Sequence, residues 1–175
     1  MKQAFQDGDA VSQTVAGAPD IRQFVTFTLG EQQYCIDIMA VREIRAANVI
    51  TPQPSAPDFV RGVINLRGTI VPIIDLRTRF ALGRTALDQG IVVVVMIDGR
   101  LKGLLVDAVS DIVTVRQGDI AGIPETGGER RNPFFDGLIT QGEAMLIVIS
   151  LEGLAWSSVQ ATVLPSSAQP AAMVT

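Results

Sequence analysis

The sequence contains no histidine, a single cysteine and only two lysines among its 175 residues. Without histidine, the commonest general base is missing, and so are the Ser-His and Cys-His catalytic pairs. Because Cys35 stands alone, no internal disulfide can form. A zinc or copper site would lack imidazole ligands and have at most one thiolate, so we expect neither a metal ion nor another cofactor.

Phosphate-binding motifs are missing as well. The sequence has no GxxxxGK[ST] loop, and no GxGxxG segment opens a helix after a strand. The carboxylates lie mostly at expected strand ends and turns, where capping or solvated roles are commoner than catalysis. We therefore expect a protein without enzymatic activity. A small-molecule-binding barrel or a carboxylate-based hydrolase is the alternative from another class.

Basic residues are few and scattered. The formal net charge is -4, and the isoelectric point lies near 4.8. Nucleic-acid binding needs clustered Lys and Arg that release counterions, so we expect no nucleic-acid partner. The longest apolar run, residues 91–97, is too short to span a bilayer, and the first residues do not resemble a signal peptide. These features favour a cytoplasmic protein without direct membrane insertion.

The chain repeats itself. Residues 24–44 align without a gap on residues 92–112, and residues 62–76 align without a gap on residues 137–151. The apolar positions of the two copies coincide. Only the first copy carries an arginine, Arg67, in the turn that corresponds to residues 140–143. Cys35 corresponds to Gly103, which indicates a packing limit on size more than a reactive thiol.

Short strands dominate both copies. Apolar and polar residues alternate along residues 24–29 and 33–38, and the continuous apolar run 91–97 is typical of a strand buried on both faces. Arg67-Gly68 and Asp98-Gly99 predict hairpin turns. Pro72 places its strand at an edge or a bulge. We also expect short helical turns at residues 57–61 and after Asp75, and a C-terminal helix within residues 151–163.

The pattern predicts an all-β fold. About five short strands per copy would close into a small barrel or curl into a sandwich. The first unit would lie mainly within residues 22–84 and the second mainly within 85–164, although strand exchange between the copies is left open. Residues 1–20 and 165–175 have the composition of disordered tails. The ordered domain would therefore span residues 21–164.

Four segments together resemble the CheW family of bacterial chemotaxis coupling proteins. They are FVTFTLGEQQYCIDIMAVREIR (24–45), FVRGVINLRGTIVPIIDLR (59–77), GLLVDAVSDIVTV (103–115) and GLITQGEAMLIVISLEGL (137–154). They occur in the family's order and cover most of residues 22–154. The resemblance implies two tandem five-stranded SH3-like β-barrels. The loop 116–132 and Cys35 depart from the family's pattern.

The same resemblance implies an adaptor function. Proteins of this family couple the cytoplasmic tips of methyl-accepting chemotaxis receptors to the regulatory domain of the histidine kinase CheA, within a signalling array. Further CheW copies are additional candidate partners. The alternative is a CheW-like coupling protein of a separate, non-flagellar chemosensory pathway.

The resemblance also implies binding residues. The receptor groove would contain Ile38, Val41, Glu43, Ile44 and Arg67. The coupling or kinase side would contain Gly62, Asn65, Leu66 and Gly68. A helical receptor tip laid in an apolar groove is a common recognition mode, with charged residues setting the register at the rim.

Overall fold

The computed structural model describes residues 20–125 and 132–155, which contain eleven strands and three short helical turns. The strands are β1 (Ile21–Leu29), β2 (Gln32–Asp37), β3 (Val41–Ala46), β4 (Val60–Leu66), β5 (Thr69–Asp75), β6 (Ile91–Ile97), β7 (Arg100–Val106), β8 (Ala108–Arg116), β9 (Ile120–Ala121), β10 (Phe135–Gln141) and β11 (Ala144–Ile149). The turns are η1 (Ile38–Ala40), α1 (Leu76–Arg79) and η2 (Gln117–Asp119). Apart from Asp20, the two tails expected to be disordered lie outside the described residues.

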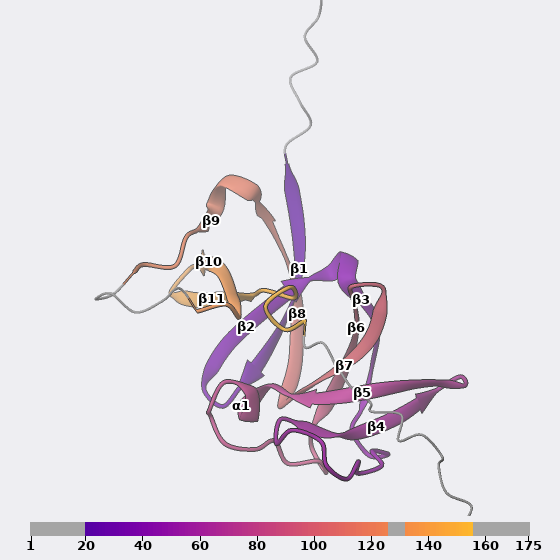
Figure 1. Ribbon diagram of the computed structural model, residues 1–175. Helices are drawn as coiled ribbons and strands as arrows, with labels where there is room; N and C mark the ends of the chain where they lie inside the picture. Colours follow the sequence, from indigo (N-terminus) through magenta and orange to yellow (C-terminus); the bar gives the residue numbers. More distant parts are fainter. Residues whose placement is uncertain (1–19, 126–131, 156–175) are drawn as a thin grey trace, which may run out of the picture.

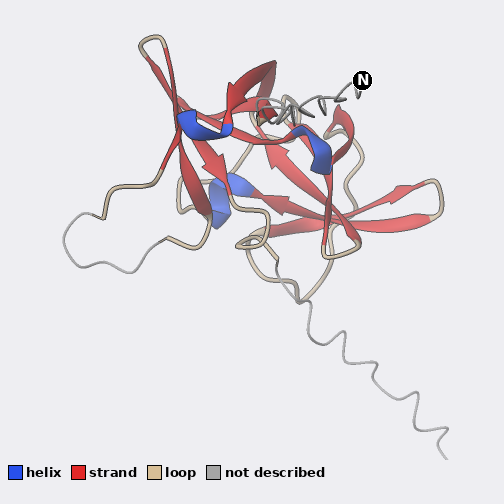
Figure 2. Cartoon of the chain, turned by 90° about the horizontal axis from the view of Figure 1, so that it is seen from above, coloured by secondary structure: helices blue, strands red, loops and turns tan. Residues whose placement is uncertain are grey.

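The strands form two sheets, which curl into two SH3-like barrels (Figures 1 and 2). Sheet A has the order β8-β1-β2-β11-β10-β9, and sheet B has the order β3-β6-β7-β5-β4. Each sheet combines a hairpin from one copy of the repeat with later strands of the other copy. The sequential division at residues 84 and 85 therefore does not describe the sheets, because the chain passes from sheet A to sheet B at η1 and returns to sheet A between β7 and β8.

Two hairpins, β1–β2 and β6–β7, pair with strands of the other copy and are buried on both faces. In β6, Val92 and Val94 point into the core of the barrel that sheet B forms, whereas Val93 and Val95 join a cluster between the two barrels. We call the latter the central cluster. Its buried members are Val25, Phe27, Leu29, Tyr34, Ile36, Ile74, Leu76, Val93, Val95, Ile97, Leu104, Val106, Ile149 and Leu154. This arrangement explains why residues 91–97 are apolar without alternation.

An arginine joins equivalent aromatic residues of the two copies. The guanidinium carbon of Arg79, at the end of α1, lies 4.4 Å from the centre of the Phe59 ring and 4.5 Å from that of Phe134. Phe59 precedes β4 and Phe134 precedes β10, at matching places in the repeat. Cation–π contacts of this kind are worth about 0.5–2 kcal/mol each, so Arg79 helps to hold the barrels together.

Cys35 and Gly103 confirm the packing limit expected from the repeat. Cys35 is fully buried inside sheet A, and burial raises the pKa of its thiol to about 12. At Gly103, a Cβ atom would lie only 2.4 Å from Cδ1 of Ile73. The thiol therefore stays protonated, which disfavours nucleophilic chemistry.

The expected helical turns have mixed outcomes. Asp75 caps α1, as predicted, by accepting hydrogen bonds from the N–H groups of Arg77 and Thr78. The turn expected over residues 57–61 is present but shorter: the Val60 N–H donates to the carbonyl oxygen of Pro57 at 2.9 Å, and β4 already begins at Val60, which pairs with Ile74. The C-terminal helix is not observed over residues 151–154, which form turns; its remainder beyond Ala155 lies outside the described residues.

Candidate protein-docking surface

In the described ranges 20–125 and 132–155, we searched for reactive groups before turning to the surface. These ranges contain no group of three or more His, Cys, Asp or Glu side chains able to hold a metal ion. Within the same ranges, every buried polar side-chain atom has a hydrogen-bond partner. No described helix has the length and apolar character needed to cross a membrane. The residues expected to bind partners therefore need to be placed on the surface of the two sheets.

Three of the five residues expected in the receptor groove share one face of β3 and η1. Val41 pairs with Val95, and Ile44 pairs with Val93. Directly paired residues of antiparallel strands point to the same side, and both valines belong to the central cluster. Ile38 and Val41 pack against this cluster, while Ile44 remains 45% exposed at the sheet edge. Ile38, Val41 and Ile44 thus form an apolar strip.

Glu43 lies on the opposite face of β3. The register shifts between Val41 and Glu43, which leaves Arg42 and Glu43 together opposite Val94. Such a β-bulge adds one residue to the strand and breaks the alternation of its side chains. Val94 points into the interior of sheet B, so Glu43 points toward that side. The five residues expected in one groove therefore lie on two faces.

Glu43 and Arg67 contact each other. Nη2 of Arg67 lies 3.0 Å from Oε2 of Glu43, and Nη1 of Arg45 lies 3.8 Å from Oε1. β3 and β4 are the two edges of sheet B, so this ion pair links an edge strand to the hairpin that follows the other edge. Because the Arg67 side chain is 78% exposed, the pair contributes at most about 1 kcal/mol to stability. It leaves a guanidinium available to a partner.

The turn between β4 and β5 presents Arg67. Arg67 and Gly68 have φ angles of 51° and 87°, as a tight two-residue hairpin turn requires. The Gly68 N–H donates to Oδ1 of Asn65 at 2.8 Å, and Leu66 is buried inside sheet B. Asn65, Leu66 and Gly68 therefore shape and anchor the turn.

Gly62 lies in β4 where a neighbouring chain segment packs closely against the strand. Its φ is +143°, and a Cβ atom there would lie 2.1 Å from the carbonyl oxygen of Thr51, which pairs with Val63. Its counterpart Gly137 would place a Cβ atom 2.8 Å from the carbonyl oxygen of Ala121. Both glycines let a second chain segment approach the strand closely. A substitution at Gly62 would act through the backbone of β4.

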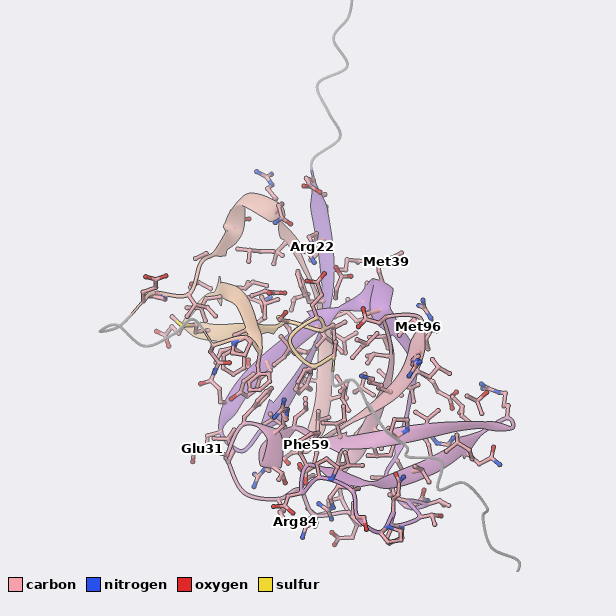
Figure 3. All side chains as sticks on the ribbon, in the orientation of Figure 1. Arg22, Glu31, Met39, Phe59, Arg84 and Met96 are labelled. Atoms are coloured by element: carbon pink, nitrogen blue, oxygen red, sulfur yellow. The ribbon has the colours of Figure 1, made fainter. Side chains whose placement is uncertain are left out.

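Met39 extends the apolar strip, although its sequence position gave no sign of it. Figure 3 shows Met39 on η1, where the chain passes from one sheet to the other. Its side chain is 78% exposed, and its carbonyl oxygen accepts a hydrogen bond from Arg42. The sequence shows only an apolar residue directly after an expected strand, which on its own does not indicate exposure.

Sheet A has an equivalent apolar edge residue. Ile112, the counterpart of Ile44, pairs with Val25 of the central cluster and is 56% exposed. Asp111 stands where sheet B has Glu43, and its backbone groups exchange hydrogen bonds with the Thr26 hydroxyl. Gly142 replaces Arg67 in the hairpin turn, so the ion pair has no equivalent there. The apolar edge is therefore present twice, and the exposed arginine once.

Comparisons with known proteins agree with this architecture. Residues 23–158 match the model of the CheW-like domain. The chain is 41% identical over 157 residues to the chemotaxis protein CheW of Klebsiella aerogenes, covering 89% of this chain and 95% of the relative. It is 40% identical over 136 residues to that of Rhizobium meliloti, covering 76% and 86%.

A solved structure is similar as well. The crystal structure of the scaffolding protein TtCheW from Thermoanaerobacter tengcongensis matches with a TM-score of 0.69 and 34% sequence identity, covering 76% of this chain and 91% of that one. The family model and the high coverage of both sequence relatives lead to one conclusion. The chain belongs to the family of CheW-like proteins.

Proposed function

We propose that this chain is a non-enzymatic chemotaxis adaptor, which couples methyl-accepting chemoreceptors to the histidine kinase CheA. The observation that carries the proposal is the match to CheW over residues 23–158. The relatives' names, chemotaxis protein and scaffolding protein, support it and favour it over a separate non-flagellar pathway. The adaptor would work in the cytoplasm, at receptor arrays.

The apolar strip supports a receptor contact. Ile38, Val41 and Ile44 face the central-cluster side, and Met39 adds an exposed apolar side chain beside them. A receptor tip is a helical hairpin, and an amphipathic helix binds through apolar residues spaced along one face. We assign this strip to the receptor.

The opposite face supports a contact with the kinase. Glu43 and Arg67 lie on the other side of β3 from the apolar strip, and one rigid helix laid on the strip would not contact both faces. Paired charges at the rim of an interface improve specificity and association rate more than affinity. We assign the Glu43–Arg67 pair and its supporting turn to the regulatory domain of CheA.

Co-sedimentation tests the proposal. The full chain, receptor-containing membranes and CheA from the same organism are mixed and centrifuged, and the chain and kinase in the pellet are quantified. We expect the chain to pellet with the receptors and to increase the amount of CheA that pellets with them. If neither protein associates with the membranes, the adaptor proposal is wrong.

Two variants separate the assigned faces. Ile44→Asp should reduce binding to receptors alone, because it places a charge on the apolar strip. Arg67→Glu should leave that binding intact and reduce recruitment of CheA. Loss of both interactions in both variants, with unchanged circular dichroism, would show that the two faces are not separate sites.

A further inference from the structure

The parallel strand pairing comprises three residue pairs in each sheet, but it is displaced along the repeat; Ile74–Leu104 and Asp75–Leu105 of sheet B have no counterpart in sheet A. In sheet A, β11 pairs with β2 from Leu146–Gln33 to Val148–Cys35. In sheet B, β5 pairs with β7 only from Ile73–Gly103 onward, and Ile73–Gly103 is the counterpart of Val148–Cys35. Sheet B thus lacks the two pairs nearest the hairpin tips.

Pro72 accounts for this difference. It stands where sheet A has Ile147, which pairs with Tyr34. Proline has no N–H to donate to a neighbouring strand, so pairing between β5 and β7 cannot extend through this position in the same way. The β4–β5 hairpin consequently diverges from the tip of the β6–β7 hairpin (Figure 1).

The divergence leaves a groove of about 550 Å³ between β5 and β7. Its apolar lining consists of Ile70, Pro72, Met96 and Leu101, with Thr69 and Gly99 beside them; Arg100 and Lys102 are its charged residues. Ile70 is 61% exposed, and its counterpart in sheet A, Met145, is 52% exposed. The groove is therefore apolar, with the exposed Arg100 at its rim, whereas Lys102 is buried.

Backbone groups also face this groove. In two-residue hairpins the residues that flank the turn exchange hydrogen bonds, and the next residue on each strand points its N–H and C=O the other way. Leu66 pairs with Thr69 across one turn, and Ile97 pairs with Arg100 across the other. The backbone groups that point away from their own hairpin partner are consequently those of Ile70 in β5 and Leu101 in β7. Both residues line the groove.

We propose that the groove between β5 and β7 binds an extended peptide segment of a partner protein, in which an aliphatic side chain is flanked by carboxylates. Backbone groups at a sheet edge recognise an extended segment by strand addition, and an apolar pocket beside them selects a side chain. The exposed guanidinium of Arg100 favours acidic flanks. The groove shares no residue with the surfaces assigned above, so the inference does not rest on the adaptor function.

NMR titration of the ¹⁵N-labelled full chain tests this inference. The probe is the capped peptide acetyl-Glu-Val-Ile-Val-Glu-amide, and the matched control replaces both glutamates with lysine. We expect saturable shifts of the amide signals of Ile70 and Leu101, with affinity about tenfold weaker for the lysine peptide. Absence of shifts, equal affinity for both peptides, or equal shifts around Met145 in sheet A would overturn the proposal.

Two variants make the test independent of any single substitution. Pro72→Ile introduces the residue of sheet A, so the amide of residue 72 should become protected from exchange and the acidic peptide should no longer bind. Ile70→Ser leaves the backbone and Pro72 in place and should weaken binding several-fold, even if Pro72→Ile does not fold. Unchanged affinity in a folded variant of either kind would contradict the proposal.

Discussion

Sheets A and B have the same framework and different surfaces. Each combines a hairpin from one copy of the repeat with strands of the other, and each has a bulged edge strand with an exposed isoleucine, Ile112 or Ile44. Sheet B differs through Asp75, Arg67 and Pro72, which replace Ser150, Gly142 and Ile147. Arg67 and Pro72 thus belong to surfaces suited to binding, whereas the buried Asp75 stabilises sheet B beyond what the two copies share.

The largest difference should appear between Asp75 and its counterpart Ser150. Asp75 is fully buried and accepts hydrogen bonds from Arg61 at 2.7 Å and from the N–H and hydroxyl of Thr85 at 3.0 and 2.9 Å. Asp75→Ala would leave the Arg61 guanidinium without its buried partner, so we expect a loss of about 3–5 kcal/mol in the free energy of unfolding.

The matched change in sheet A should cost much less. Ser150 accepts one hydrogen bond, from the Gly153 N–H at 3.2 Å. Ser150→Ala should therefore lose about 1 kcal/mol. Urea unfolding of both variants measures the two losses in the free energy of unfolding, and equal values would show that Asp75 and Ser150 contribute equally.

The paired glycines should differ by a smaller amount. Gly62→Ala would place Cβ 2.1 Å from a carbonyl oxygen at a φ of +143°, whereas Gly137→Ala would place it 2.8 Å from one. We expect losses of about 3 and about 1 kcal/mol in the free energy of unfolding. Thermal unfolding measures both. A milder effect at Gly62 than at Gly137 would mean that the Thr51 segment moves aside easily.

Acid should weaken the cap of sheet B selectively. Burial alone would raise the pKa of Asp75, but hydrogen bonds from Thr85 and Arg61 outweigh it and hold the pKa below its ordinary value. The stability that this carboxylate contributes is present above about pH 4, the pKa of an unfolded aspartate, and is lost as pH falls through the lower folded value. Unfolding free energies measured from pH 6 to pH 2 should fall less steeply in Asp75→Asn than in the wild type.

The smallest effect on stability should come from the exposed ion pair. Arg67→Ala removes a contact with Glu43 that is worth at most about 1 kcal/mol, so thermal unfolding should be almost unchanged. Assembly with CheA and receptors should nevertheless weaken. Glu143→Ala, in the equivalent turn of sheet A, is the matched control and should assemble normally. If Arg67→Ala also assembles normally, Arg67 is only a turn residue.

The sequence predicted the strands and hairpins well because alternation and turn residues act locally. It left strand exchange open, since the two copies have the same apolar pattern and either hairpin could complete either sheet. The face of Glu43 could not be foreseen, because the bulge at Arg42 reverses the alternation expected for β3. Pro72 indicated an edge or a bulge; it lies in an internal strand, at a position where pairing with β7 has not yet begun.

Phosphorylation of CheA in the presence of receptor-containing membranes tests the proposed coupling most directly. Kinase activity is measured with and without the full chain, using receptors and CheA from the same organism. We predict that adding the chain raises the rate of CheA autophosphorylation severalfold and that Arg67→Glu does so less effectively. An unchanged rate with the wild-type chain, under conditions where all three proteins are folded, would contradict the proposed function.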